Sequence, residues 1–286
     1  MIRMLSTSEF AKALGVSESS VRRLADAGDL EIQRTRGGHR RIPVEEAIRY
    51  VREQHIEVAY PEMLGLIVDA QPGESAQYEM LRVLRRGHAA SVVRYVHSLY
   101  ASGMSVAELC DGPIAFAFAQ IGAAWPHDKR AIFIEHRALM LCQRALNQLH
   151  AAIGNPEPDA PEAIGGGVSG DVYMLPSLMV SLVVHELGFN ETNLGPNMPI
   201  DVLTDCVFDE KPKLLWVTIS EPINSRTRMR EMMTLASAAA ETNTTMLIGG
   251  RHAGSIDELS KTMEHSWRHC SSMMDLHRTA RHLLET

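Results

Sequence analysis

The spacing of apolar positions divides the chain into three stretches. Over residues 1–55, short amphipathic segments end at glycines and are followed by a segment in which polar and apolar residues alternate. Over residues 75–155, apolar positions recur every three or four residues, which predicts long amphipathic helices. Over residues 160–286, short apolar runs alternate with helical segments. This last pattern predicts repeated β-α units.

The first stretch predicts a helical (all-α) winged helix-turn-helix head. One helix covers residues 7–15, and a second covers residues 17–28, with Ser17 as its N-cap and a glycine at its end. Residues 30–42 alternate around a Gly-Gly turn, which predicts a β-hairpin. A third helix then begins with Pro43 at its first position.

The polar residues of this head favour double-stranded DNA as a partner. The first 55 residues hold ten Lys and Arg against eight Asp and Glu, whereas the remainder holds 18 against 27. Small polar residues and arginines on the first turns of the second helix suit major-groove contacts, and the hairpin arginines suit phosphates or the minor groove. The alternative is a solvated basic turn. The predicted DNA contacts are Ser19, Ser20, Arg22, Arg23, Arg34, Arg36, His39, Arg40 and Arg41.

Residues 75–155 predict a four-helix bundle, preceded by a linker over residues 56–74. The expected helices cover 78–86, 88–101, 105–125 and 129–153, with a break at residues 111–113, Asp-Gly-Pro. Near the bundle end, Trp125 is followed after nine residues by Glu135 and His136, with His127 close by. These side chains indicate a pocket for a flat, partly polar ligand. The alternative is a core tryptophan beside a solvated helix face.

Residues 160–286 predict a Rossmann-like, flavodoxin-like α/β domain with a parallel sheet. Strands are expected at 163–168, 191–194, 213–219 and 244–249, and helices at 175–188, 200–210, 225–241 and near the C-terminus. Ligands bind at the carboxyl ends of such strands. Ser220, Gly249 and Gly250 are therefore candidate ligand contacts, because the glycines would let a ligand approach the backbone.

Composition narrows the class of protein. The four cysteines show neither CxxC nor CxxH spacing, so neither a zinc site nor a disulfide framework is indicated. No apolar run is long enough to span a bilayer, and the N-terminus lacks a secretion signal. We therefore expect a soluble cytoplasmic protein without a membrane partner.

The sequence has no nucleophile–base pair, metal cluster or phosphate loop, so we do not expect an enzyme.

The run SVRRLADAGDLEIQRTRGGHRRIP resembles the winged helix-turn-helix of the MerR and excisionase-like superfamily. The order of head, bundle and Rossmann-like tail resembles the cobalamin-dependent photoreceptor repressors of that superfamily. In that family a Trp, nine intervening residues and Glu-His form the bundle signature over the upper face of adenosylcobalamin, and Trp125, Glu135 and His136 show this spacing. The resemblance implies a transcriptional regulator that senses light or a ligand and changes its oligomeric state.

The chain departs from this family where cobalt is bound. The family carries Asp/Glu-x-His-x-x-Gly, whose imidazole ligates cobalt, whereas this chain has Tyr173 at the histidine position and Pro176 at the glycine position. Pro126 also replaces a family histidine. The cofactor is therefore left open: a non-standard corrinoid or another tetrapyrrole, without a confident metal ligand, rather than His-ligated cobalamin.

Three interpretations follow. The first is a DNA-binding regulator with a ligand pocket, assembled as a homo-oligomer such as a dimer or tetramer. The second is a regulator with an emptied pocket used for dimerisation or for a partner protein. The third is a corrinoid-carrier or enzyme subunit, which the missing histidine disfavours.

Overall fold

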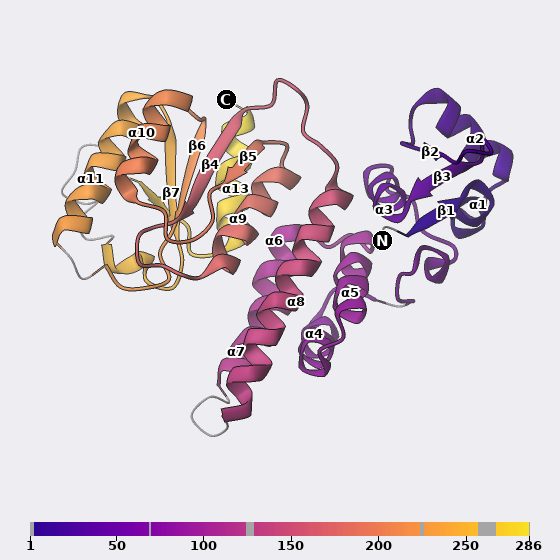
Figure 1. Ribbon diagram of the computed structural model, residues 1–286, viewed down its shortest axis with the longest axis horizontal. Coiled ribbons are helices and arrows are strands. Elements are labelled where there is room, and N and C mark those ends of the chain that lie inside the picture. Colours follow the sequence, from indigo (N-terminus) through magenta and orange to yellow (C-terminus); the bar gives the residue numbers. More distant parts are fainter. Residues whose placement is uncertain (1–2, 69, 124–128, 224–225, 257–266, 286) are drawn as a thin grey trace. The chain divides into compact units, whose positions relative to one another are not determined.

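The computed structural model describes all residues except 1–2, 69, 124–128, 224–225, 257–266 and 286. Its contacts divide the chain into two compact units, Met1–Gly154 and Asn155–Thr286. Figure 1 shows the helices and strands of each unit. In the described part of the chain, no helix has the length and apolarity needed to cross a membrane.

The N-terminal unit begins with a helix-turn-helix and a small sheet. Its helices are α1 (Thr7–Leu14), α2 (Glu18–Ala27) and α3 (Val44–Glu53). Strands β1 (Met4–Ser6), β2 (Gln33–Arg34) and β3 (Arg40–Pro43) form an antiparallel sheet in the order β1-β3-β2. The predicted hairpin is present as β2 and β3, while β1 is an additional strand, so the head is not purely helical.

Local sequence explains where these helices begin and end. Ser6 forms a capping box with Glu9 at the start of α1. Ser17 caps α2, as the sequence predicted, and Gly15 and Gly28 end the two helices in left-handed conformations. Pro43 is the N-cap of α3 rather than its first helical residue. The head is therefore specified largely by short-range signals.

The bundle contains α4 (Glu74–Arg86), α5 (Ala89–Ala101), α6 (Val106–Leu109), α7 (Ala115–Gly122) and α8 (Lys129–Ile153). The expected break at residues 111–113 is a π-helical turn, Cys110–Ile114, that joins α6 to α7. A wider turn accommodates Pro113, which lacks a donor N–H. Part of the predicted linker is packed: it contains a 3-10 turn, Pro61–Leu64, and Leu64 and Leu66 are buried.

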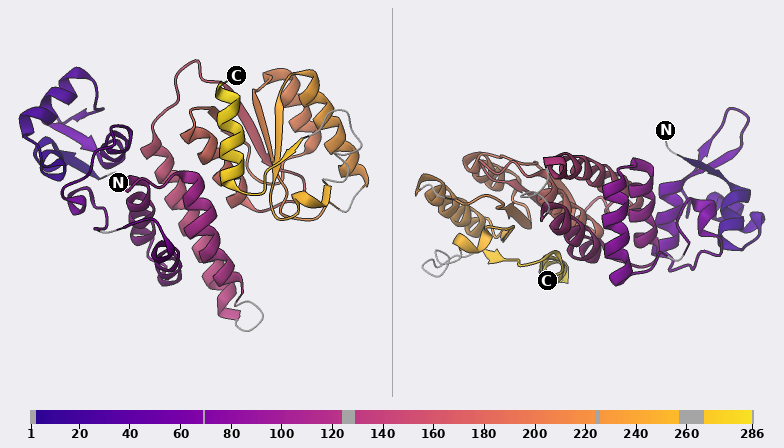
Figure 2. Two further views of the ribbon diagram at one scale, coloured as in Figure 1. Left: turned by 180° about the vertical axis from the view of Figure 1, so that it is seen from behind. Right: turned by 90° about the horizontal axis from the view of Figure 1, so that it is seen from below.

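The C-terminal unit is a five-stranded parallel sheet between two layers of helices (Figure 2). Its strands are β4 (Glu162–Gly167), β5 (Asn190–Asn193), β6 (Leu214–Thr218), β7 (Thr245–Gly249) and β8 (Arg268–His269), in the order β5-β4-β6-β7-β8. Its helices are α9 (Met174–Glu186), α10 (Ile200–Glu210), α11 (Arg226–Glu241) and α13 (Met273–Glu285), with a 3-10 turn at Ala253–Ile256. The short strand β8 was not predicted.

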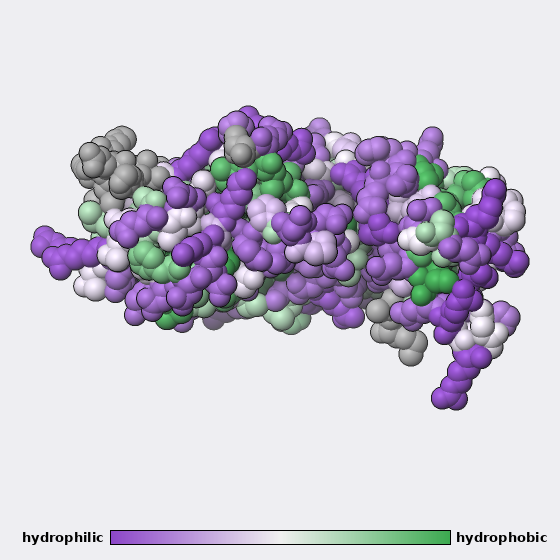
Figure 3. Space-filling model, turned by 90° about the horizontal axis from the view of Figure 1, so that it is seen from above, coloured by the Kyte–Doolittle hydropathy of each residue, from purple (hydrophilic) through white to green (hydrophobic). Residues whose placement is uncertain are grey.

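The two sheet faces bury different side chains. Leu215 and Val217 of β6 lie in an apolar core with residues of α10 and α11. Trp216 projects to the other face, where its indole nitrogen donates to Ser177 of α9. The alternation follows from the period of two along a strand. The outer surface seen in Figure 3 is mostly hydrophilic, with small apolar patches.

Candidate functional site

Three serines gather at the start of α2. The Ser17 Oγ accepts a hydrogen bond from the Ser20 backbone N–H at 3.2 Å, and it lies 2.8 Å from the Ser19 Oγ and 2.9 Å from the Ser20 Oγ. Ser19 is exposed and Ser20 is half-buried. The first turn of α2 therefore presents hydroxyl groups at a helix N-terminus, which is suited to hydrogen bonds with base edges or phosphates.

The arginines of α2 are held by neighbouring side chains. Arg22 donates to the Glu18 carboxylate at 2.8 Å, and Thr7 of α1 donates to the same oxygen at 2.7 Å. These hydrogen bonds are the largest causes that lower the pKa of Glu18. Arg23 lies 3.4 Å from the Ser20 hydroxyl. Glu18 and Thr7 were not singled out in the sequence; the i, i+4 spacing of Glu18 and Arg22 is the feature that indicates their pairing.

The hairpin between β2 and β3 projects from the head, as the right-hand view of Figure 2 shows. Its turn is closed by hydrogen bonds between Thr35 and His39, and Gly38 adopts a left-handed conformation with φ +79°. Arg34, Arg36 and His39 are exposed. The hairpin thus presents two arginines and an imidazole to solvent.

Ion pairs leave part of the basic charge of the head available. Arg40 pairs with Asp26 at 2.5 Å, and Arg49 pairs with Glu46 and Glu53. Glu46 is buried and also accepts the Glu31 N–H. Within the described residues, four arginines of the predicted DNA surface have no ion-pair partner: Arg23, Arg34, Arg36 and Arg41. The unpaired positive charge of the predicted DNA surface therefore lies on α2, the hairpin and the adjoining strand β3.

The bundle residues of the predicted ligand pocket are only partly described. Trp125 and His127 lie outside the described residues. On α8, His136 is exposed between Ile132 and Met140, one turn away on each side, and their exposed fractions are 41% and 60%. One carboxylate oxygen of Glu135 is buried and has no hydrogen-bond partner within the described part of the chain. The face of α8 around His136 is therefore an apolar stripe that contains one imidazole.

A second cluster lies at the carboxyl edge of the sheet, in the loops after β4 and β6. Asp171 is buried, and its carboxylate accepts the backbone N–H groups of Tyr173 at 3.0 Å and Ser220 at 2.5 Å. The Asn197 side chain accepts the Gly170 N–H at 2.7 Å, and the Asn197 N–H donates to the Asp171 carbonyl at 2.8 Å. These bonds join the loops after β4 and β6, and the Asn197 loop after β5, at the point where strand order reverses.

Tyr173 occupies the position at which the resembling family has its cobalt ligand. The phenol is 43% exposed, and its pKa is raised, first by burial and then by the nearby Glu221 carboxylate. Each oxygen of Asp171 accepts one backbone N–H group, so this carboxylate holds the loops around Tyr173 and Ser220. A neutral phenol is a poor ligand for cobalt. The residues of this edge therefore do not fit a histidine-ligated cobalamin.

The other candidate contacts of this edge are Ser220, Gly249 and Gly250, and the two glycines lie close to neighbouring backbone. Ser220 is half-buried, and its hydroxyl has no hydrogen-bond partner among the described residues. A Cβ on Gly250 would lie 2.5 Å from the Ile219 carbonyl oxygen, and Gly250 has φ +109°. On Gly249, a Cβ would lie 3.3 Å from the Cys270 carbonyl. The absence of a side chain at Gly250 is thus required by the protein backbone, whatever binds nearby.

Comparison with known proteins assigns the head to a family model. A helix-turn-helix domain model matches residues 4–55. No curated protein matches the full sequence. The helix-turn-helix predicted from the sequence is therefore confirmed, and its match ends two residues after α3.

Solved structures are similar to the bundle and the α/β domain. The monomethylamine corrinoid protein of Methanosarcina barkeri is 14% identical with a TM-score of 0.54, over 74% of this chain and 100% of its own. A methanol:cobalamin methyltransferase complex from Methanosarcina barkeri is 14% identical (TM-score 0.38; 94% and 93% covered). A cobalamin-binding protein from Desulfitobacterium hafniense is 15% identical (TM-score 0.39; 76% and 99% covered). The chain thus combines a helix-turn-helix domain with the fold of a corrinoid protein.

Proposed function

We propose that this chain is a DNA-binding transcriptional regulator whose bundle and α/β domain form its sensory part. The observation that carries the proposal is the helix-turn-helix at residues 4–55 with exposed arginines on α2 and the hairpin. In such a domain the second helix enters the major groove while the hairpin contacts the backbone or the minor groove. We further propose that the chain has no catalytic activity of its own.

The regulator acts as a homo-oligomer in this proposal. Two heads bind half-sites about one helical turn apart, so that the symmetry of the operator follows that of the protein. A ligand changes the spacing of the heads only if it binds one arrangement of the oligomer more tightly than the other. Light has the same effect only if it changes this preference. Changes in oligomeric state are therefore expected to change operator affinity.

Substitution of the hairpin arginines tests the DNA-binding mode. We expect Arg36→Ala to weaken binding to all duplexes and to reduce the salt slope of log K by roughly one unit, because one phosphate contact is lost. Arg40→Ala is expected to act in the same direction, with a smaller effect, because Arg40 is already paired with Asp26. The measurement is fluorescence anisotropy of labelled duplex DNA at several salt concentrations.

Lys12→Ala is the matched control, since Lys12 is an exposed cation on α1 outside the predicted DNA surface. Equal affinities and slopes for Arg36→Ala and the unchanged protein would show that the hairpin does not contact DNA.

For the sensory part we propose a non-standard corrinoid or another tetrapyrrole. The exposed apolar stripe of α8 around His136 and the buried carboxylate oxygen of Glu135, which no described residue pairs, support a flat, partly polar ligand. Tyr173 argues against a histidine-ligated cobalamin. In this proposal the candidate contacts His136, Glu135, Tyr173 and Ser220 have only binding and orienting roles.

Absorption spectroscopy tests this ligand. We expect the purified protein to shift the visible spectrum of a corrinoid, heme or bilin when they are mixed, and His136→Ala to reduce this shift. His282→Ala, on α13, is the control for the loss of an exposed imidazole. Tyr173→His is expected to strengthen cobalamin binding, because imidazole is the better cobalt ligand.

The second candidate is a regulator without a cofactor, in which the same surfaces serve dimerisation or a partner protein. The specific observation is the phenol of Tyr173 at the position of the family's cobalt ligand, beside an Asp171 carboxylate that already accepts the Tyr173 and Ser220 N–H groups. Two results together would favour this candidate. The spectra of all three ligands would stay unchanged, and light scattering would show a smaller oligomer for His136→Ala than for the unchanged protein.

A further inference from the structure

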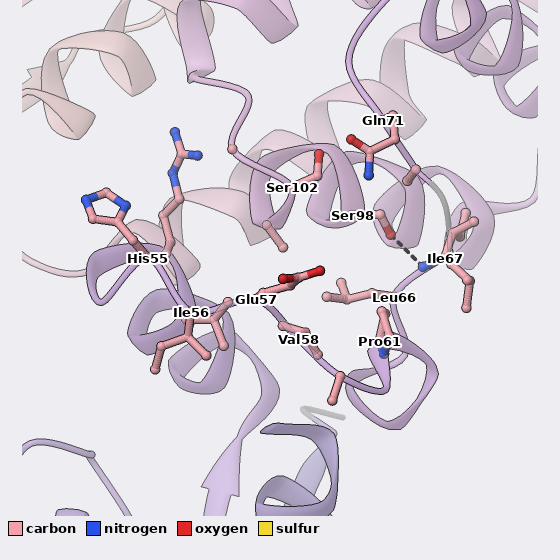
Figure 4. A pocket seen from close by; sticks show the side chains of 17 residues that line it. His55, Ile56, Glu57, Val58, Pro61, Leu66, Ile67, Gln71, Ser98 and Ser102 are labelled. Atoms are coloured by element: carbon pink, nitrogen blue, oxygen red, sulfur yellow. Dashed lines mark hydrogen bonds between the residues drawn. The ribbon is translucent and has the colours of Figure 1, made fainter. Parts of the chain in front are cut away.

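A cavity of about 540 Å³ lies within the N-terminal unit (Figure 4). Its walls are the end of α3, the loop residues 55–59, 61, 66–68 and 70–71, and the C-terminal end of α5. The volume lies within the range of about 300–1,000 Å³ that is typical of small-molecule sites. None of the residues assigned above to DNA or to a tetrapyrrole lines it. The cavity is therefore a separate candidate site.

Hydrogen bonds hold the loop that forms the apolar wall. The Leu66 N–H donates to the Pro61 carbonyl at 2.9 Å, and Arg94 donates to the Leu66 carbonyl at 3.2 Å. The Ile67 N–H donates to the Ser98 hydroxyl at 2.8 Å. Leu66 and Ala70 are buried, so the wall is formed before any ligand binds.

The polar groups that face the cavity are mainly acceptors. The Glu57 carboxylate points into the cavity (Figure 4), and among the described residues it has neither a hydrogen bond nor an ion pair. The Ser102 hydroxyl donates to the Leu99 carbonyl at 2.8 Å, which leaves its oxygen free to accept. Gln71 adds an amide whose oxygen can also accept. These acceptors on the cavity wall favour a ligand that carries a positively charged donor.

The cationic residues of the lining are directed elsewhere. The Arg52 guanidinium lies over the Tyr100 ring, 4.8 Å from its centroid. The His55 ring points away from the middle of the cavity in Figure 4. Among the described lining residues, the charge that faces the cavity is therefore that of Glu57, which is also exposed to solvent, and apolar side chains such as Val58 and Leu66 form part of the remaining surface.

We propose that this cavity binds a small organic cation with an apolar body, such as a protonated amine. The ammonium group donates to Glu57, Gln71 and Ser102, and the hydrocarbon part packs on Val58 and Leu66. A charge-assisted hydrogen bond to an otherwise unpaired carboxylate is the strongest interaction available in the cavity. The site goes beyond the proposed function, because it uses neither the predicted DNA surface nor the candidate tetrapyrrole contacts.

Calorimetric titration of the full chain with hexylammonium, hexanoate and hexanol tests the proposal. The three probes share one apolar chain and differ in head-group charge. We expect hexylammonium to bind at least about tenfold more tightly than either other probe. Glu57→Gln should remove this preference, and Ser102→Ala should weaken hexylammonium about threefold.

Glu62→Gln is the matched control, because Glu62 is exposed on the neighbouring turn and does not line the cavity. It should bind hexylammonium as the unchanged protein does. Equal affinity for the three probes, preference for hexanoate, or no effect of Glu57→Gln would overturn the proposal. DNA affinity is independent of these results, so failure here leaves the assignment of the head unaffected.

Discussion

Phe10→Ala is expected to lower the free energy of unfolding of the N-terminal unit by about 3–5 kcal/mol, as large-to-small core substitutions of this kind do. Phe10 is fully buried on α1 and meets the Tyr50 ring of α3 edge to face, with centroids 6.2 Å apart. Its loss leaves a cavity between two helices that position α2. Since whole domains are stable by only about 5–15 kcal/mol, DNA binding should be largely lost at 37 °C.

Urea unfolding followed by circular dichroism measures this change. Val16→Ala is the control, because Val16 lies just beyond α1 with 46% of its surface exposed, and surface changes usually cost within about 0.5 kcal/mol. A loss of less than about 1 kcal/mol for Phe10→Ala would contradict the described core of the head.

Trp216→Ala should destabilise the C-terminal unit by a similar amount, about 3–5 kcal/mol. The Trp216 side chain is 1% exposed, and its Nε1 donates to the Ser177 hydroxyl at 3.0 Å, which in turn donates to Asn193 at 2.8 Å. The indole also fills the space over Gly165, where any Cβ would overlap it. The substitution therefore removes core volume and breaks a buried hydrogen-bond chain.

The unfolding of this unit is measured by heat or urea, with Phe208→Ala as control. Phe208 is an aromatic residue of α10 with 43% of its surface exposed, and we expect its loss to cost about 1 kcal/mol or less. Equal destabilisation by the two substitutions would show that Trp216 is not a core residue.

Most helices and strands could be predicted because their signals are local. Ser17, Gly15 and Gly28 define the ends of α1 and α2, and the apolar runs before residues 219 and 249 identify β6 and β7. The strand β1 escaped prediction because its three residues pair with β3, far along the chain. The two-residue strand β8 is too short to show a period.

The candidate sites were less predictable, because their geometry depends on contacts between distant residues. The exposed hairpin arginines follow from sequence, but the pairing of Arg40 with Asp26 does not. The hydrogen bond from the Ser220 N–H to the Asp171 carboxylate joins loops 49 residues apart. The cavity beside Glu57 arises where a predicted linker packs onto α5, so no local pattern indicated it.

The salt dependence of DNA binding tests the regulator assignment most directly. The affinity of the full chain for duplex DNA is measured by anisotropy at several salt concentrations. With four arginines free to neutralise phosphates on each head, log K should fall linearly with log salt, with a slope of about −3 to −4 per head. No binding to any duplex at low salt, or an affinity independent of salt, would contradict DNA recognition by this protein.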